Sequence, residues 1–197
     1  MAMRILVGCE ESQIYTKAFC ALGHDAYSCD IQGTRGDSTR HITGDVFKAI
    51  KLRGPWDMGV FFPPCTRVAV SGARWFKYYI AEQRLALEFM RDLLEAPIER
   101  IAMENPISVF SSYWRKPDQI VQPWMFGHQE TKATCWWLKN LPLLTPTNVV
   151  GPPVTPGEKR DFAKVHRMPP GPNRARDRST AYPGMAAAAA LQWAGRA

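Results

Sequence analysis

The sequence predicts one α/β domain with a mostly parallel sheet over residues 1–197, and three observations lead to that prediction. Short apolar runs of the buried-strand type alternate with segments whose apolar residues recur at helical spacing. The apolar runs end abruptly in glycine, proline or acidic residues, as strands do where they leave a sheet. The length suits one domain with a sizeable core, and the hydrophobic fraction of 46% is ordinary for a globular protein.

The alternation begins near the start of the chain. RILVGCE (4–10) predicts a buried strand, and the segment after it predicts a helix with Ser12 as N-cap and a glycine at its end. DAYSCDI (25–31) predicts a second strand. HITGDVFKAI (41–50) predicts a short strand or turn, followed by a short helix.

The middle of the chain continues the pattern. WDMGVFF (56–62) predicts a third strand, which Pro63 and Pro64 stop. Residues 74–97 predict the longest helix, because apolar residues recur there at helical spacing and a proline closes the segment. RIAMEN (100–105) predicts a fourth strand. In sheets built this way, ligands bind beyond the carboxyl ends of the strands.

The pattern loosens in the last third. QIVQPWMFG (119–127) and KATCWWLKNLP (132–142) predict two strands joined by a turn. Residues 145–180 are rich in Pro, Gly and basic residues and predict an extended basic loop. Residues 181–197 predict a terminal helix with a polyalanine body.

Charge and cysteine usage narrow the function classes. The net charge of +7 and the pI of about 9.3 favour phosphate-bearing partners such as nucleic acid or nucleotides, with solubility alone as the alternative. Five cysteines with no CxxC pair argue against a disulfide framework and a zinc site, and the four histidines are scattered. No apolar run is long enough for a membrane span. We therefore expect reduced thiols, a cytoplasmic location and no metal.

Polar residues collect where the predicted strands end. These residues are Gly8, Cys9, Glu10 and Glu11, then Asp30, then Asp45, then Pro63, Pro64 and Cys65, and finally Glu104, Asn105 and Pro106. Taken singly, an acid there can cap a helix or pair with an arginine, and a cysteine can be a small core residue. Because the carboxyl ends of parallel strands share one edge of the sheet, we expect these residues together to form a site.

Two of these stretches carry a family resemblance. FFPPCT and the later MENP resemble the paired motifs of cytosine-C5 methyltransferases, in which a Pro-Cys turn carries the nucleophile and a Glu-Asn pair holds the base. The second half, in QPWMFGHQETKATCWWLKNLPLLTPTN and RDRSTAYPGMAAAAALQW, resembles small phage and prophage proteins described as DNA cytosine methyltransferases. The resemblance implies a Rossmann-like class I methyltransferase fold, with helices on both faces of a mostly parallel sheet.

The resemblance assigns chemistry to individual residues. Cys65 matches the nucleophile that adds to carbon 6 of cytosine, and Glu104 matches the acid that binds ring N3 and the amino group. Asn105 and Pro64 match positions that contact the base. The two prolines before Cys65 restrict the backbone and so help to aim the thiol.

The resemblance also implies S-adenosylmethionine as cofactor. Gly8 matches the glycine loop, Asp30 the acid for the ribose hydroxyls, and Asp45 the acid near the adenine; Glu10, Ser12 and Pro63 complete the predicted cofactor site. The family's first motif has two glycines, whereas this chain has VGCEES with one, and Glu10 stands where the second is expected. Ser12 and the helix N-terminus are the predicted donors to the cofactor's carboxylate.

Other positions depart from the family pattern. Lys132 is the candidate counterpart of the arginine that contacts the cytosine carbonyl, with a solvated lysine as the alternative. Arg174, Arg176 and Arg178 are candidate phosphate contacts, or part of a disordered basic loop. Little chain remains for the target-recognition region of sequence-specific DNA methyltransferases, so no separate recognition domain is expected.

Three functions remain open. The first is C5 methylation of cytosine in DNA, and the second is C5 modification of a free cytidine nucleotide. The third is a catalytically weak nucleic-acid-binding protein, for instance one that acts against host restriction. Amino methylation ranks lower, because Phe62 precedes the two prolines where that chemistry needs Asp or Asn. The sequence leaves open whether the chain forms a homodimer.

Overall fold

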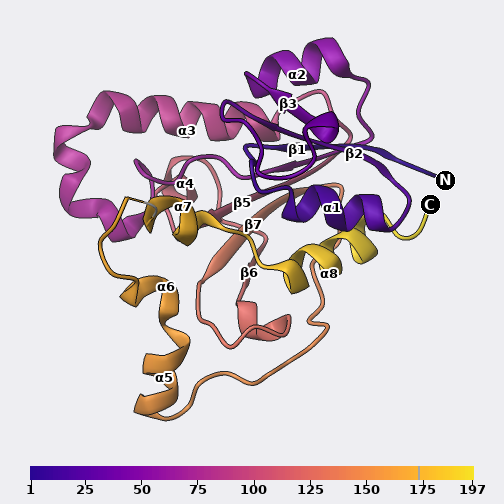
Figure 1. Cartoon of the computed structure of the whole chain (residues 1–197). Coiled ribbons are helices and arrows are strands. Elements are labelled where there is room, and N and C mark those ends of the chain that lie inside the picture. The colour runs from indigo at the N-terminus through magenta and orange to yellow at the C-terminus, as the bar shows by residue number, and fades with distance from the viewer. Residues whose placement is uncertain (173) are drawn as a thin grey trace.

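The computed structural model describes residues 1–172 and 174–197, and within them a seven-stranded sheet lies between two layers of helices (Figure 1). The strands are β1 (Arg4–Gly8), β2 (Asp25–Asp30), β3 (His41–Thr43), β4 (Met58–Phe61), β5 (Arg100–Pro106), β6 (Gln119–Val121) and β7 (Thr134–Lys139). The α-helices are α1 (Ile14–Ala21), α2 (Val46–Arg53), α3 (Ile80–Leu94), α4 (Phe110–Tyr113), α5 (Pro156–Phe162), α6 (Lys164–Arg167), α7 (Arg174–Ser179) and α8 (Pro183–Trp193). Short 3₁₀ helices are η1 (Ser38–Arg40), η2 (Val70–Tyr78) and η3 (Pro123–Met125).

The strands follow the order β3-β2-β1-β4-β5-β7-β6. The first five strands run parallel, and β7 runs antiparallel to both β5 and β6. This order, with one antiparallel strand beside the edge, is that of the Rossmann-like class I methyltransferase fold. The predicted fold class is therefore confirmed, and the carboxyl ends of β1, β2, β4 and β5 meet at one rim.

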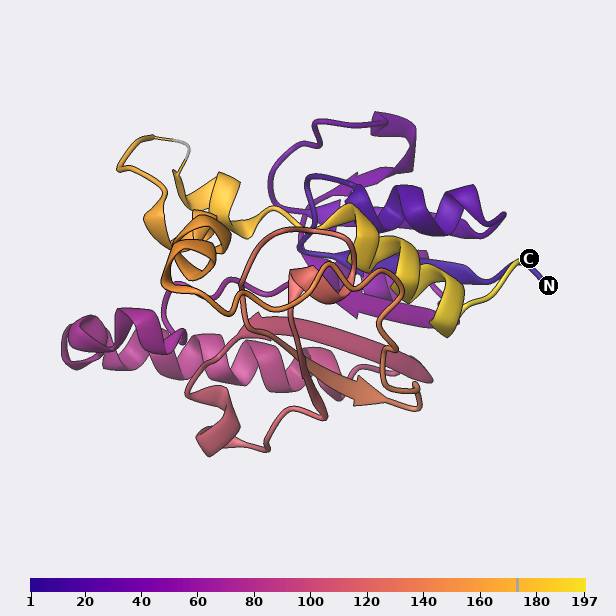
Figure 2. The same ribbon diagram turned by 90° about the horizontal axis from the view of Figure 1, so that it is seen from below.

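Two helical layers bury the two faces of the sheet (Figure 2). One core contains Leu6, Phe61 and Met103 from the sheet, packed with residues of α2, α3 and α4. The other core contains Ile5 and Val7 from the sheet, packed with residues of α1 and α8. The assignment alternates along each strand because successive side chains of a strand point to opposite faces.

The polyalanine body of α8 has a packing reason. Ala188, Ala189 and Ala190 are buried against the sheet and α1, where short side chains let α8 approach closely. At the start of α8, a Cβ on Gly184 would lie 2.0 Å from the carbonyl oxygen of Phe126. Small residues therefore decide how closely α8 seats on the domain.

Two predicted elements differ from the structure. The helix expected over 74–97 begins only at Ile80, because residues 70–78 form the 3₁₀ helix η2 before α3 starts. The segment 145–180, expected as an extended loop, contains α5, α6 and α7. A capping box starts α5: the Thr155 hydroxyl accepts from Glu158 N, and the Glu158 carboxylate accepts from Thr155 N. None of the helices in the described part of the chain is long and apolar enough to span a membrane.

Candidate active site

The predicted nucleophile lies in a turn held by both central strands. After β4 ends, Phe62 N donates to the Gly8 carbonyl at 3.0 Å, so the chain leaves the sheet beside β1. The Pro63 carbonyl accepts from Asn105 Nδ2 at 3.0 Å, which ties the turn to β5. The Cys65 carbonyl accepts from Val68 N and Ala69 N, and the half-buried thiol packs against the core. Contacts to β1 and β5 thus fix the turn that carries Cys65.

The end of β5 holds buried polar atoms that have no partner. Within residues 1–172 and 174–197, four buried side-chain atoms make no hydrogen bond: Glu104 Oε1, Asn105 Oδ1, Ser108 Oγ and Trp136 Nε1. Three of them lie at or just after the end of β5. The fourth belongs to β7, where Trp136 lies opposite Glu104 in the antiparallel pair. Glu104 and Trp136 share one face of the sheet, whereas Asn105 points to the other face because side chains alternate along a strand. Buried polar groups are normally satisfied, so the pair Glu104 and Trp136 fits a place where a ligand supplies the missing partners.

Electrostatic effects couple the two predicted catalytic residues. Burial raises the pKa of the Glu104 carboxyl above its usual value, and the positive charge of Lys132 partly opposes that rise. Burial also raises the pKa of the Cys65 thiol, and the nearby Glu104 carboxylate raises it further. Lys132 and Arg178 act in the opposite direction on Cys65. Glu104, Lys132 and Arg178 thus all act electrostatically on Cys65, and the catalytic roles of these residues stay predictions.

The basic segment reaches this site through Lys132. Its Nζ donates to the Arg178 carbonyl at 3.1 Å and lies 5.7 Å from the centre of the Tyr182 ring. Arg174 Nε instead donates to the Met168 carbonyl, and the exposed Arg176 lies 3.6 Å from the Asp177 carboxylate. Of the three arginines predicted as phosphate contacts, only Arg178 acts electrostatically on Cys65.

The Glu10 side chain accepts hydrogen bonds from the first turn of α1. Glu10 Oε1 accepts from Tyr15 N at 2.7 Å, and Glu10 Oε2 accepts from Thr16 N at 3.3 Å and from the Thr16 hydroxyl at 2.8 Å. Glu10 is only 5% exposed. Burial raises the pKa of its carboxyl, while the hydrogen bonds from Tyr15 and Thr16 oppose the rise. Glu10 therefore supplies the hydrogen-bond acceptors at this helix end.

The predicted role of Ser12 as N-cap is wrong. The N-cap position of α1 is Gln13, and no side chain caps the helix from that position. Ser12 Oγ lies 3.5 Å from Ile14 N, a long contact compared with those of Glu10. Cys9 and Gln13 have φ values of 60° and 59°, in the left-handed region that glycine adopts most readily. The turn after β1 therefore adopts glycine-like backbone angles at two residues that are not glycine.

The remaining cofactor candidates include two carboxylates, Asp30 and Asp45, and one glycine, Gly8. Asp30 lies half-buried at the end of β2, where its Oδ1 accepts from Gln32 N at 2.9 Å, and such a carboxylate suits ribose hydroxyls. Asp45 is exposed and caps α2 by accepting from Lys48 N at 2.9 Å. Gly8 is enclosed, because an added Cβ would lie 2.6 Å from Phe61 and 2.7 Å from Val46.

These contacts test the predicted cofactor against the residues present. Asp30 after β2 suits the ribose, whereas the two acids after β1 are already bonded, Glu10 to α1 and Glu11 to Arg35. Burial, with Asp30 as the next cause, raises the pKa of the neighbouring Cys9 thiol to about 12. The first free N–H groups of α1, which would bind the cofactor's carboxylate, are instead bonded to Glu10. The residues therefore fit the nucleoside part of S-adenosylmethionine and not a carboxylate bound at α1.

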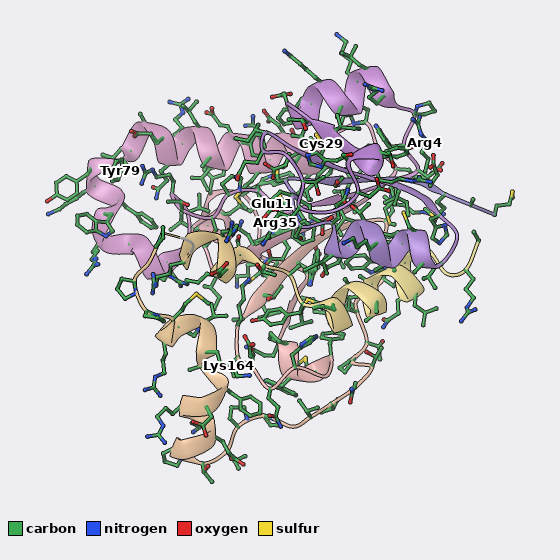
Figure 3. The ribbon with its side chains drawn as sticks, viewed as in Figure 1. Arg4, Glu11, Cys29, Arg35, Tyr79 and Lys164 are labelled. Carbon is green, nitrogen blue, oxygen red and sulfur yellow. The ribbon has the colours of Figure 1, made fainter. Side chains whose placement is uncertain are left out.

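An ion pair connects the loop after β2 to the turn after β1. Glu11 forms a bidentate ion pair with Arg35, with distances of 2.7 and 2.6 Å (Figure 3). Asp177 of α7 contributes to raising the pKa of the Arg35 guanidinium. The loop after β2 and α7 are thus electrostatic neighbours at the rim of the sheet.

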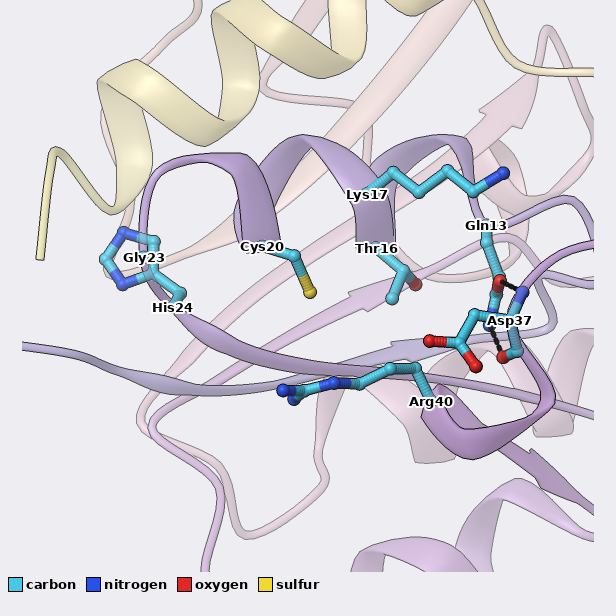
Figure 4. Close-up of a pocket in the computed structure, with 8 residues that line it drawn as sticks. All are labelled: Gln13, Thr16, Lys17, Cys20, Gly23, His24, Asp37 and Arg40. Carbon is cyan, nitrogen blue, oxygen red and sulfur yellow. Dashed lines mark hydrogen bonds between the residues drawn. The ribbon is translucent and has the colours of Figure 1, made fainter.

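The clearest hollows of the described part of the chain lie away from Cys65. A pocket of about 360 Å³ runs along α1 beside η1, where Gln13 Nε2 donates to the Asp37 carbonyl at 2.8 Å and Asp37 N donates to Gln13 Oε1 at 2.6 Å (Figure 4). A second hollow of about 250 Å³ is lined by Arg4, Tyr27 and Trp56. Neither hollow is lined by Cys65 or by a residue that has an unpartnered atom.

The described residues contain no group of three His, Cys, Asp or Glu side chains that could hold a metal ion. All five cysteines are free. Cys9 lies in the turn after β1, whereas Cys20, Cys29 and Cys135 lie in α1, β2 and β7.

Comparison with known proteins adds one likeness. The chain is similar to a crystal structure of a protein provisionally described as a DNA modification methyltransferase, encoded within a prophage of E. coli, at a TM-score of 0.49 and 12% sequence identity. The match covers 75% of this chain and 52% of the other, so this chain spans about half the length of that protein. No protein-family profile and no curated protein matches the chain.

Proposed function

We propose that this chain is an S-adenosylmethionine-dependent methyltransferase that acts on carbon 5 of cytosine in DNA, with Cys65 as its nucleophile. The observation that carries the proposal is the pair of unpartnered buried atoms Glu104 Oε1 and Trp136 Nε1, which belong to residues directly opposite each other near the end of β5, the strand that Asn105 ties to the Cys65 turn. A bound pyrimidine offers both donors and acceptors along one edge, and these are what the pair lacks. Leaving the atoms unpaired costs about 1–3 kcal/mol each, and a ligand that pairs them recovers part of that cost.

Cys65 supplies covalent catalysis in this proposal. Its thiolate forms an Sγ–C6 bond with the cytosine ring, and the electron density that it adds moves to C5. Once C5 has reacted, loss of the C5 proton and cleavage of the Sγ–C6 bond restore the aromatic ring and the thiolate. Burial and Glu104 raise the pKa of the thiol and favour its protonated form, whereas Lys132 and Arg178 act against that rise and favour the thiolate.

Glu104 positions the base and manages its charge. A carboxyl group with a raised pKa can keep its proton, donate it to ring N3 and accept from the exocyclic amino group. That contact stabilises the charge that develops as the thiolate adds. Asn105 joins the base site to the Cys65 turn through Pro63, and Lys132 is the proposed contact to the cytosine carbonyl.

S-adenosylmethionine, when bound, supplies an electrophilic methyl group. In this proposal Asp30 holds its ribose, and the backbone around Gly8 and Pro63 approaches it. Glu10 occupies N–H groups at the end of α1 that would otherwise bind its carboxylate.

Covalent trapping tests the proposal. A DNA strand with 5-fluorocytosine at the target position should remain bound to the protein when methyl donor is present, because fluorine is not lost as a proton is. Mass spectrometry should find the adduct on the tryptic peptide that contains Cys65, and Cys65→Ser should abolish it. Cys20→Ser is the matched control and should retain trapping. Adduct formation by Cys65→Ser, or none by the native chain, contradicts the proposed nucleophile.

A separate experiment distinguishes DNA from free cytidine nucleotides as the substrate. Duplex DNA, single-stranded DNA and cytidine nucleotides should be offered side by side with a tritiated methyl donor. Transfer to cytidine nucleotides in preference to either form of DNA would replace the DNA proposal with the nucleotide-modifying alternative.

One observation favours a second candidate, a nucleic-acid-binding protein with little catalytic activity. Glu10 occupies helix donors that a cofactor carboxylate would otherwise use, which weakens the case for methyl transfer. Calorimetry with S-adenosylhomocysteine separates the two. The absence of binding at millimolar ligand, together with retained DNA binding, would favour this second candidate.

A further inference from the structure

The 3₁₀ helix η2 presents aromatic side chains to solvent directly after the nucleophile turn. Trp75 is 51% exposed and Tyr78 is 64% exposed, and their ring centres lie 6.2 Å apart. By contrast, Trp56, Trp136, Trp137 and Trp193 are buried. Large aromatic side chains normally enter the core, so two adjacent exposed rings mark a surface that meets a partner.

Positive charge accompanies these rings. The Arg74 guanidinium carbon lies 5.1 Å from the Trp75 ring centre, and Lys77 Nζ lies 4.9 Å from the Tyr78 ring centre. Residues 66–81 contain Arg67, Arg74 and Lys77 and no acidic residue. Neither Arg74 nor Lys77 forms an ion pair with the described residues. Arg74, Trp75, Lys77 and Tyr78 are hereafter the aromatic platform.

Two backbone hydrogen bonds attach the segment that precedes the aromatic platform to the chain beyond β5. At the start of η2, Val70 N donates to the Ile107 carbonyl at 3.0 Å, just beyond β5. Val109 N donates to the Val68 carbonyl at 3.0 Å, which closes the contact from the other side. At the far end Tyr79 joins η2 to α3, as Figure 3 shows at the edge of the molecule. The segment that leads to the platform is therefore held beside the end of the strand that carries Glu104.

We propose that the aromatic platform binds single-stranded nucleic acid, with unpaired bases stacked on Trp75 and Tyr78 and the phosphates neutralised by Arg74 and Lys77. Interleaved aromatic and basic side chains are the combination that binds single strands without base-specific hydrogen bonds, because every base offers a π-face. The inference deepens the proposed function, on which the choice of a polynucleotide ligand rests. It assigns to the platform the nucleotides that flank the target cytosine.

A second occupant is chemically conceivable, and the charges argue against it. Ile80 and Leu85 of α3 are also exposed, so another protein surface or a second copy of the chain could cover this region. An apolar protein contact gains little from Arg74 and Lys77, which form no ion pair with the described residues. A polyanion does gain from them, and the release of its counterions adds to the affinity.

Binding of a fluorescein-labelled single-stranded DNA of about twelve nucleotides, a length within the range that one such site covers, tests the inference without any methyl transfer. Trp75→Ala and Tyr78→Ala should each weaken binding by about 5- to 100-fold, the range expected for one lost base–aromatic stack. Trp75→Phe keeps a stacking face and should retain most of the affinity. Leu52→Ala removes another exposed apolar side chain, from α2, and should leave binding unchanged.

The dependence on salt separates stacking from charge. Arg74→Ala should lower the slope of log affinity against log salt by about 0.7, the contribution of one phosphate contact on a single strand. Trp75→Ala should leave that slope unchanged. Affinity for cytidine monophosphate should be the same for Trp75→Ala and the native chain, because a mononucleotide has no flanking base.

The outcomes separate this inference from the proposed chemistry. Single-strand binding within about twofold of native in both alanine variants would overturn the platform, even if trapping on Cys65 succeeds. Loss of binding in the alanine variants would support the platform, even if trapping fails. A native dimer that Trp75→Ala converts to a monomer in sedimentation would instead identify a second copy of the chain as the occupant.

Discussion

The ends of β1 and β5 lie at the same rim of the sheet, yet the glutamates at these two ends differ in their hydrogen bonding. Both oxygens of Glu10 accept hydrogen bonds from the first turn of α1, and nothing more is needed to satisfy them. Glu104 is also shielded, but its Oε1 has no partner among the described residues. Burial raises the pKa of both carboxyls, and only that of Glu10 is opposed by hydrogen bonds.

The difference separates a glutamate that the fold uses from one that the fold leaves available. A carboxylate with all its bonds made contributes to stability and has little capacity for a ligand. One buried without partners lowers stability, which is a common property of functional sites. We therefore expect substitutions at the two positions to affect different measurements.

The largest expected effect is on catalysis at the β5 end. Glu104→Gln removes the proton that the proposed mechanism places on ring N3, so methyl transfer should fall by about 10²- to 10⁴-fold. Steady-state transfer from a tritiated donor measures it. Glu10→Gln is the matched control, and its loss of activity should be much smaller. Equal losses in the two variants would erase the distinction between the two strand ends.

The next effect concerns the end of β2. Asp30→Ala should weaken binding of S-adenosylhomocysteine by about 1–3 kcal/mol, as expected for hydrogen bonds to a charged group. Isothermal titration calorimetry measures this change, with Asp45→Ala as the companion variant. Asp45 already caps α2, so its substitution should lower helix stability more than cofactor affinity. Unchanged affinity in Asp30→Ala would remove the ribose assignment.

The β1 end should respond in stability. Glu10→Ala leaves the N–H groups of Tyr15 and Thr16 without their acceptor, so the free energy of unfolding should fall by about 1–2 kcal/mol. Urea denaturation at neutral pH measures the change. Ser12→Ala should have little effect, because its contact to Ile14 N is long. If Ser12→Ala proves the more destabilising, the cap has been assigned to the wrong side chain.

The smallest effect is a slope with pH. The folded-state pKa of Glu104 is raised, so the native chain has its full stability below the ordinary glutamate pKa and loses stability as pH rises through the raised value. Glu104→Gln escapes that loss. The difference in unfolding free energy between the variant and the native chain should grow with pH, by up to about 1.4 kcal/mol per pH unit within this window. A difference that stays constant from mildly acidic to neutral pH contradicts the assigned shift.

Most of the sheet was predictable because its strands are local features of the sequence. The runs 4–10, 25–31, 56–62 and 100–105 each contain a strand, since apolar residues fill positions buried on both faces. The start of α3 was not predictable from periodicity, because η2 also carries aromatic residues at nearly helical spacing. A signal for α5 was present in Thr155 and Glu158, whose spacing is that of a capping box.

The part of the candidate site that was predictable is the part that follows from strand ends meeting at one rim of the sheet. That rule placed Cys65 near Glu104, and the segment just before β7 carries Lys132, whose charge acts on both. Trp136 and Ser108 were missed, because their position depends on the pairing of β7 with β5 and on the chain beyond β5. The role of Glu10 was missed because it requires the left-handed backbone at Gln13, which the residue type does not announce.

The packing of α8 on α1 has a consequence for folding speed. Ala197 N donates to the Leu22 carbonyl and His24 contacts the Gly195 carbonyl, so segments far apart in sequence close one face of the sheet. Contacts of such long range require a large loop to close first, which slows folding. Until α8 docks, the core around Ile5, Val7 and Val60 on that face remains incomplete. We expect a slow final folding phase, during which the exposed strands make the chain prone to aggregation.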